Sequence, residues 1–194
     1  PQRELLEEEA VRQKFEEEVD SYLIDFIVFY DHGNEQALIG ADGQPIIDVN
    51  NVDKLKDREI YTLACLSAKN LGKLAYQRGC KAFWGYVDSF GFTVDDFEEA
   101  FKELAGFGLL LKLMGRTWAQ AKEETVNRYL YWIDKAYQAG NFWAESMLRN
   151  NLNALRVWNG EKPPAEECPV SRLVESLLGY KALLRLRKVR DALF

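Results

Sequence analysis

The pattern of apolar and polar residues predicts a helix followed by three buried strands. Apolar residues at intervals of three and four predict the helix over 3–20. Continuous apolar runs predict strands at Tyr22–Tyr30, Ile60–Ala64 and Cys80–Tyr86, as expected for strands that are covered on both faces. A short helix over 67–78 joins the last two strands, which is the spacing of a right-handed parallel crossover. We therefore expect an α/β fold with a parallel sheet.

Turn residues separate the first two strands. Ala41-Asp-Gly-Gln44 lies between two short apolar stretches, which predicts a small β-hairpin that projects from the end of the sheet. Beyond Thr93 the period is helical throughout. The second of these helices has Thr117 as a candidate N-cap. Beyond Thr93 four helices are predicted, over about 94–113 (broken or kinked near Gly106 and Gly108), 117–138, 141–157 and near 170–192.

Three parallel strands make a small sheet for an α/β domain, because such sheets are usually larger and are covered on both faces. The chain also begins with Pro1 rather than Met. We therefore expect further strands in a segment that precedes Pro1 or in a second chain that completes the sheet. Residues 1–92 would form the α/β core, and residues 93–194 would form a helical C-terminal part packed on the same domain.

Composition narrows the class of protein. With 47% apolar and 29% charged residues, the 194-residue chain is typical of a soluble globular protein. A net charge of −6 argues against nucleic acid as the main partner. The apolar stretches are too short for a membrane helix and no signal peptide is visible, so we expect no membrane partner. The charge is uneven: the first twenty residues are rich in Glu and the last fifteen in Lys and Arg. One explanation of this uneven charge is two solvated helix faces. The other is that the two ends of the chain contact each other or a partner of opposite charge.

The cysteines suggest a reducing, cytoplasmic location. The three residues Cys65, Cys80 and Cys168 are too few and too scattered for a disulfide framework. No pair has zinc-site spacing and the chain has a single histidine, so we expect no metal and no cofactor.

The candidate chemistry lies at the ends of the first two predicted strands. His32, the single histidine, follows the first strand, and Cys65 ends the second. Ligands bind in open α/β sheets outside the carboxyl ends of the strands. Imidazole titrates in the range needed to activate a thiol. Gly33 has no Cβ, so its amide and that of Cys65 could together bind an oxyanion. Taken separately, a strand-end cysteine is usually a core residue and a histidine beside glycine is usually a turn residue.

Other chemistries for Cys65 lack their residues. A tyrosine-phosphatase loop would need Arg where Leu71 stands, and a thioredoxin motif would need Cys where Ala68 stands. Ser67 has no flanking glycine of a nucleophile elbow.

The segments Phe29-Tyr-Asp-His-Gly33 and Tyr61-Thr-Leu-Ala-Cys-Leu-Ser-Ala68 resemble the two active-site strands of caspase-like (clan CD) cysteine peptidases. Gly79-Cys-Lys-Ala-Phe-Trp-Gly-Tyr86 is similar to the next strand of gingipain-like and CHAT-like members. The resemblance covers roughly residues 22–92. It implies a three-layer α/β/α fold, followed here by a helical C-terminal extension. It also implies His32 as general base and acid, Cys65 as nucleophile, and the amides of Gly33 and Cys65 as oxyanion hole.

The resemblance does not transfer a substrate specificity. The acidic residue that some members carry two positions before the cysteine is Leu63 here. We consider Asp88 and Trp84 as substrate-binding residues. Asp88 would favour a basic P1 side chain, although a solvated loop aspartate explains it equally well. Trp84 would line the cleft only if its end of the strand is open, since aromatics that alternate along a strand usually pack in the core.

The sequence thus predicts an endopeptidase that hydrolyses protein or peptide substrates through a thioester. The first alternative is a catalytically inactive caspase-like module that serves protein–protein assembly or signalling. A flavodoxin-like or receiver-like module would need a phosphate loop or an acidic cluster at a strand end, and neither is found. The basic segment 181–194 is expected to be a terminal core helix, with a membrane or partner-helix role as the weaker alternative.

Overall fold

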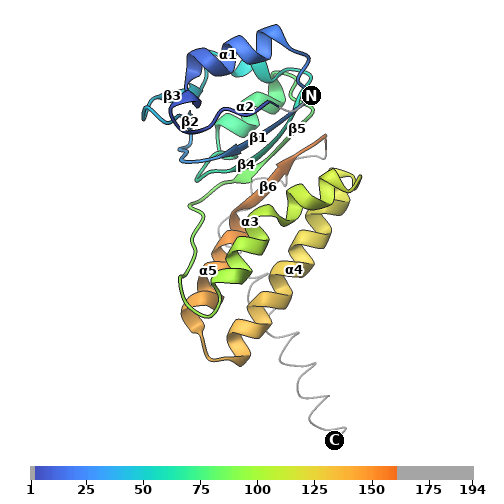
Figure 1. Cartoon of the computed structure of the whole chain (residues 1–194). Coiled ribbons are helices and arrows are strands. Elements are labelled where there is room, and N and C mark those ends of the chain that lie inside the picture. Colours follow the sequence, from blue (N-terminus) through green and yellow to red (C-terminus); the bar gives the residue numbers. More distant parts are fainter. Residues whose placement is uncertain (1–2, 161–194) are drawn as a thin grey trace, which may run out of the picture. The chain divides into compact units, whose positions relative to one another are not determined.

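The structure is a computed structural model and describes residues 3–160. Its centre is a four-stranded sheet in the order β1-β4-β5-β6 (Figure 1). The first three strands are parallel and the last is antiparallel to its neighbour. The chain is therefore a mixed α/β protein with a mostly parallel sheet, as predicted. The strands are β1 (Phe26–Tyr30), β4 (Glu59–Leu63), β5 (Ala82–Tyr86) and β6 (Leu155–Trp158).

One face of the sheet is covered by the helix α1 (Arg12–Ser21), the helix α2 (Leu71–Gln77) and the predicted hairpin (Figure 1). The hairpin strands are β2 (Leu38–Ile39) and β3 (Pro45–Ile47). Two short 3₁₀ turns, η1 (Glu7–Glu9) and η2 (Val52–Leu55), belong to the same part of the chain. The first predicted helix therefore begins at Arg12 rather than near residue 3.

The other face is covered by helices from the later part of the chain. They are α3 (Glu98–Leu113) and the start of α4 (Trp118–Gln138), whereas α5 (Phe142–Ala154) packs mainly against α3 and α4. Thr117 caps α4 as predicted: its hydroxyl accepts from the Gln120 amide, and the Gln120 side chain accepts from the Thr117 amide. This reciprocal pair satisfies two of the N–H groups that have no partner within a helix.

Of the predicted break or kink near Gly106 and Gly108, the break is wrong, because α3 is one helix through both positions. Gly108 instead permits close packing: a Cβ there would lie 2.4 Å from Cζ2 of Trp84. The missing side chain therefore lets the helix backbone approach the indole ring.

The prediction of a purely helical remainder is wrong at β6. The third predicted helix ends at Ala154, and the next four residues pair with β5 from Leu155↔Tyr86 to Trp158↔Phe83. The sheet therefore gains its fourth strand from within the described chain. The helix predicted near 170–192 lies outside the described residues. Between residues 3 and 160 no helix is long and apolar enough to cross a membrane.

Candidate active site

The strand register, extended two residues beyond the last pair, would place His32 opposite Cys65. The β1–β4 pairs run from Phe26↔Glu59 to Tyr30↔Leu63, a constant offset of 59 − 26 = 33. The offset between His32 and Cys65 is also 65 − 32 = 33. Each residue follows its strand by two positions. If the paths of the two strands continue side by side, the imidazole and the thiol lie across one gap at the carboxyl edge of the sheet.

Contacts at Gly33 show that the two paths do stay together. A Cβ on Gly33 would lie 2.9 Å from the carbonyl oxygen of Cys65 and 3.0 Å from the Cβ of Ala64. The two backbones therefore touch immediately beyond the strands. This is the close approach for which a glycine is required, and it brings the segment of His32 against the segment of Cys65.

The turn after His32 leaves the Gly33 amide unused. The Asn34 amide donates to the Ala37 carbonyl (2.9 Å), and the Ile39 amide donates to the His32 carbonyl (3.0 Å). These two bonds lie on either side of the antiparallel β-bridge between Gly33 and Leu38. Gly33 and Leu38 are therefore a non-hydrogen-bonded pair, in which neither residue bonds to the other. Within residues 3–160, neither the Gly33 nor the Cys65 amide donates a hydrogen bond. Neither amide therefore has an acceptor among these residues, which is what an oxyanion hole requires.

Asn34 builds that turn, and it is not among the site residues predicted from the sequence. Its side-chain oxygen accepts from the amides of Gln36 (2.8 Å) and Ala37 (2.9 Å), so the chain turns back directly after Gly33. The signal was available, because an Asn after His-Gly and before a short apolar stretch is typical of a turn.

The segment after Cys65 contains a strained residue. Leu66 adopts φ 59°, the left-handed region, which a branched apolar side chain seldom occupies. Its amide donates to the Asp88 carbonyl (3.2 Å), and the Ala68 amide donates to the Tyr86 carbonyl (2.9 Å). The turn that carries the cysteine is thereby attached to the end of β5. Backbone strain of this kind is common at functional sites.

Ser67 is a structural residue. It is buried, and its hydroxyl donates to the Ala64 carbonyl (2.9 Å) and lies 2.8 Å from the hydroxyl of Thr62. A nucleophilic serine would be open to substrate, so this geometry agrees with the absence of an elbow motif.

Solvent can reach the candidate residues. His32 is exposed and Cys65 is partly exposed. The carboxylate of Asp31 accepts from the His32 amide (2.7 Å), so it is bonded to the backbone of the turn. The buried Cys80 differs: its thiol donates to the carbonyls of Arg58 and Ala82, and burial raises its pKa to about 12. Since thiolate is the reactive form, Cys80 is chemically inert at neutral pH.

The two predicted substrate-binding residues have different surroundings. Asp88 is exposed, and its carboxylate accepts from the Ser89 amide (2.7 Å). Its backbone lies beside the turn that follows Cys65, as the bond from Leu66 requires. Asp88 therefore stands at the same sheet edge as the candidate pair.

The prediction that Trp84 lines a cleft is wrong in this structure. Its side chain is completely buried. The indole stacks on Tyr61 with 5.3 Å between ring centroids and lies 5.8 Å from Trp118. The physical reason is strand alternation: this position of β5 points into the layer between the sheet and α3/α4. It is a core residue.

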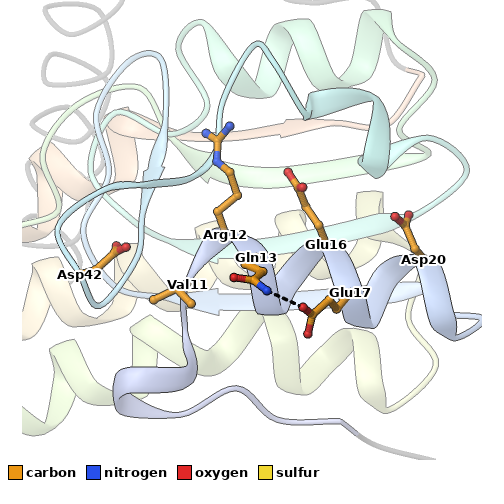
Figure 2. A pocket seen from close by; sticks show the side chains of 7 residues that line it. All are labelled: Val11, Arg12, Gln13, Glu16, Glu17, Asp20 and Asp42. Atoms are coloured by element: carbon orange, nitrogen blue, oxygen red, sulfur yellow. Dashed lines mark hydrogen bonds between the residues drawn. The ribbon is translucent and has the colours of Figure 1, made fainter.

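A shallow hollow lies elsewhere, along α1 (Figure 2). Its lining is mainly acidic, and the guanidinium of Arg12 is already bound to Asp48 (2.6 Å). Among residues 3–160 no group of His, Cys, Asp and Glu side chains is arranged to hold a metal ion. The lining consists of Val11, Arg12, Gln13, Glu16, Glu17, Asp20 and Asp42.

No protein-family model, no curated protein and no solved structure matches the chain.

Proposed function

We propose that the chain is a cysteine endopeptidase with a caspase-like three-layer fold. One observation carries the proposal: the Gly33 backbone packs directly on the Cys65 carbonyl. This contact supports a single site at the carboxyl edge of the sheet for the thiol and the imidazole. The partly exposed Cys65 and the exposed His32 agree with access by a substrate.

In the proposed mechanism, the sulfur of Cys65 attacks the scissile carbonyl carbon while His32 takes the thiol proton. The negative charge on the carbonyl oxygen is bound by the amides of Gly33 and Cys65, which have no other acceptor among residues 3–160. The C–N bond then breaks, and His32 gives its proton to the leaving amine. Water, deprotonated by His32, attacks the thioester, and cleavage of the C–S bond regenerates the thiol and releases the carboxylic acid.

The substrate is a protein or a peptide, and Asp88 is the residue we assign to P1 selection. Its carboxylate is exposed and its backbone adjoins the turn after Cys65. A negative group at this place would attract Lys or Arg at P1.

A second candidate is an inactive caspase-like module used in assembly. This alternative is favoured by the burial of Trp84. Of the two proposed substrate-binding residues, Asp88 alone is then accessible to a substrate. The experiment below separates the two functions.

The test is covalent labelling by an electrophilic peptide probe with Arg at P1. We expect Cys65→Ala to abolish labelling. We expect His32→Ala to slow labelling at least about 10³-fold, because the Cys65 thiol then has no base to take its proton. Cys80→Ala is the matched control and should label like the wild type, since that thiol is buried.

Specificity is tested in the same assay. A probe with Arg at P1 should react faster than one with Asp, and Asp88→Ala should reduce the preference. Labelling that persists in His32→Ala at the wild-type rate, or that is absent from wild type with every probe, would favour the inactive module.

A further inference from the structure

The sheet has an open edge at β1 within the described chain. The Glu59 amide donates to the Asp25 carbonyl (2.8 Å), so the backbone of residue 25 faces β4. Backbone groups alternate sides along a strand. The N–H and C=O groups of Phe26, Val28 and Tyr30 therefore point away from β4, toward the open edge.

The edge adjoins exposed apolar side chains. Val28 and Tyr30 are 42% and 48% exposed, although both belong to a strand of the central sheet. The helix α3 passes beside Tyr30, because a Cβ on Gly106 would lie 3.9 Å from the Tyr30 hydroxyl. Leu110 and Leu113 follow Gly106 by four and seven positions and so share its side of the helix. They are 52% and 69% exposed, which extends the apolar surface along α3.

The strand β1 lacks the features that protect a free edge. Its sequence, Phe-Ile-Val-Phe-Tyr, contains no charge and no proline, and its pairing with β4 has no bulge. The opposite edge strand, β6, carries Arg156 in its four residues. Natural proteins place charges, proline or bulges on edges that remain solvated. The composition of β1 is that of a strand with neighbours on both sides.

Charges at the two ends of β1 indicate the partner. Asp25 and Asp31 are both exposed, and neither forms an ion pair with a residue between 3 and 160. In an antiparallel pairing of two copies centred on Val28, Asp25 of each copy would face Asp31 of the other. A parallel pairing would place identical aspartates together. Like charges that face each other destabilise strand pairing, so a second copy is disfavoured.

We propose that the β1 edge binds an extended strand from a separate polypeptide, with apolar residues at alternate positions and Lys or Arg at its ends. The strand would pair with the outward backbone groups of β1 and cover Val28 and Tyr30, and its basic ends would lie near Asp25 and Asp31. This proposal does not depend on peptidase activity.

The test is binding of fluorescent peptides to the 194-residue chain carrying Cys65→Ala, so that cleavage plays no part. The peptide Lys-Val-Thr-Val-Thr-Val-Lys should bind, as measured by anisotropy. The same peptide with Glu at both ends should bind at least about tenfold more weakly, because its ends repel the aspartates.

Substitutions in β1 locate the interaction. Val28→Pro removes the central outward N–H but leaves the β1–β4 ladder intact, and should weaken binding at least about tenfold. Val28→Thr keeps that N–H and the branched side chain, and should bind within about twofold of the parent. Asp25→Lys is a surface change that should raise affinity for the Glu-ended peptide and lower it for the Lys-ended one.

Several outcomes would overturn the proposal. They are equal binding of both peptides, no binding of either, unchanged binding by Val28→Pro, or a concentration-dependent dimer that Val28→Pro abolishes. The last would assign the edge to a second copy. Labelling at Cys65 is measured separately, so failure here leaves the proposed peptidase standing.

Discussion

Cys65 and Cys80 each lie two residues from a strand of the sheet, but they occupy opposite environments. Cys80 precedes β5 and is sealed: it is 2% exposed and donates to two backbone carbonyls. Cys65 follows β4 and stays partly exposed, in a turn attached to the end of β5. The amino end of the sheet is closed by backbone bonds such as that from the Lys81 amide to the Arg58 carbonyl. Burial, rather than position at a strand end, thus distinguishes a structural thiol from a candidate nucleophile.

Two glycines repeat this contrast. Gly108 lets α3 approach the Trp84 ring in the core, whereas Gly33 lets one backbone touch another at the carboxyl edge. A Cβ would clash at both positions, with the Trp84 side chain at Gly108 and with the Cys65 carbonyl at Gly33. The core uses close approach for packing, and the edge uses it to bring two strand ends together.

The largest expected effect is on the core side. Trp84→Ala should lower the free energy of unfolding by about 3–5 kcal/mol, because it leaves a cavity among Tyr61, Trp118 and Gly108. Asp88→Ala, on the edge side, should change it by less than about 0.5 kcal/mol. Denaturant unfolding of both variants measures the difference. A loss below about 1 kcal/mol for Trp84→Ala would contradict the packing described.

An intermediate effect is expected at Gly33. Gly33→Ala introduces a methyl group 2.9 Å from the Cys65 carbonyl, so the two segments must separate, at a cost of about 1–3 kcal/mol. Probe labelling of Cys65 should fall as well. Gly106→Ala is the control, since its new methyl meets nothing nearer than 3.9 Å and should stabilise α3 by at most about 1 kcal/mol. Labelling that survives in Gly33→Ala would show that the contact does not organise the site.

The smallest effect on stability is expected at Leu66. Leu66→Gly removes left-handed strain of about 1–2 kcal/mol, but glycine gives the unfolded chain more conformational entropy and lacks the leucine side chain. These effects oppose each other, so the free energy of unfolding should change by less than about 1 kcal/mol. Labelling of Cys65 should nevertheless fall about tenfold, because the turn is no longer held in one conformation. Asp57→Gly relaxes a similar backbone (φ 61°) before β4 and should leave labelling unchanged. Equal labelling by both variants would remove any role for the strain at Leu66.

Much of the fold was predictable because its signals are local. Apolar runs located β1, β4 and β5, and helical periods located α3, α4 and α5. The wrong predictions concern residues whose structure depends on contacts with segments far away in the sequence. The residues of β6 continue a helical pattern but pair with β5, some seventy positions earlier in the chain. Trp84 could be placed on a strand from the sequence, but the layer into which it points depends on where α3 and α4 pack.

By itself, the sequence determined most of the helices and strands, the parallel crossover and the placement of His32 and Cys65 after successive strands. Only the tertiary structure decided that Gly33 touches the Cys65 carbonyl, that Trp84 is core, and that β1 is an edge of the sheet formed by residues 3–160. The physical reason is range. Periodicity and turn chemistry act over a few residues, whereas burial and strand neighbours depend on segments far apart in the chain that meet only when it folds.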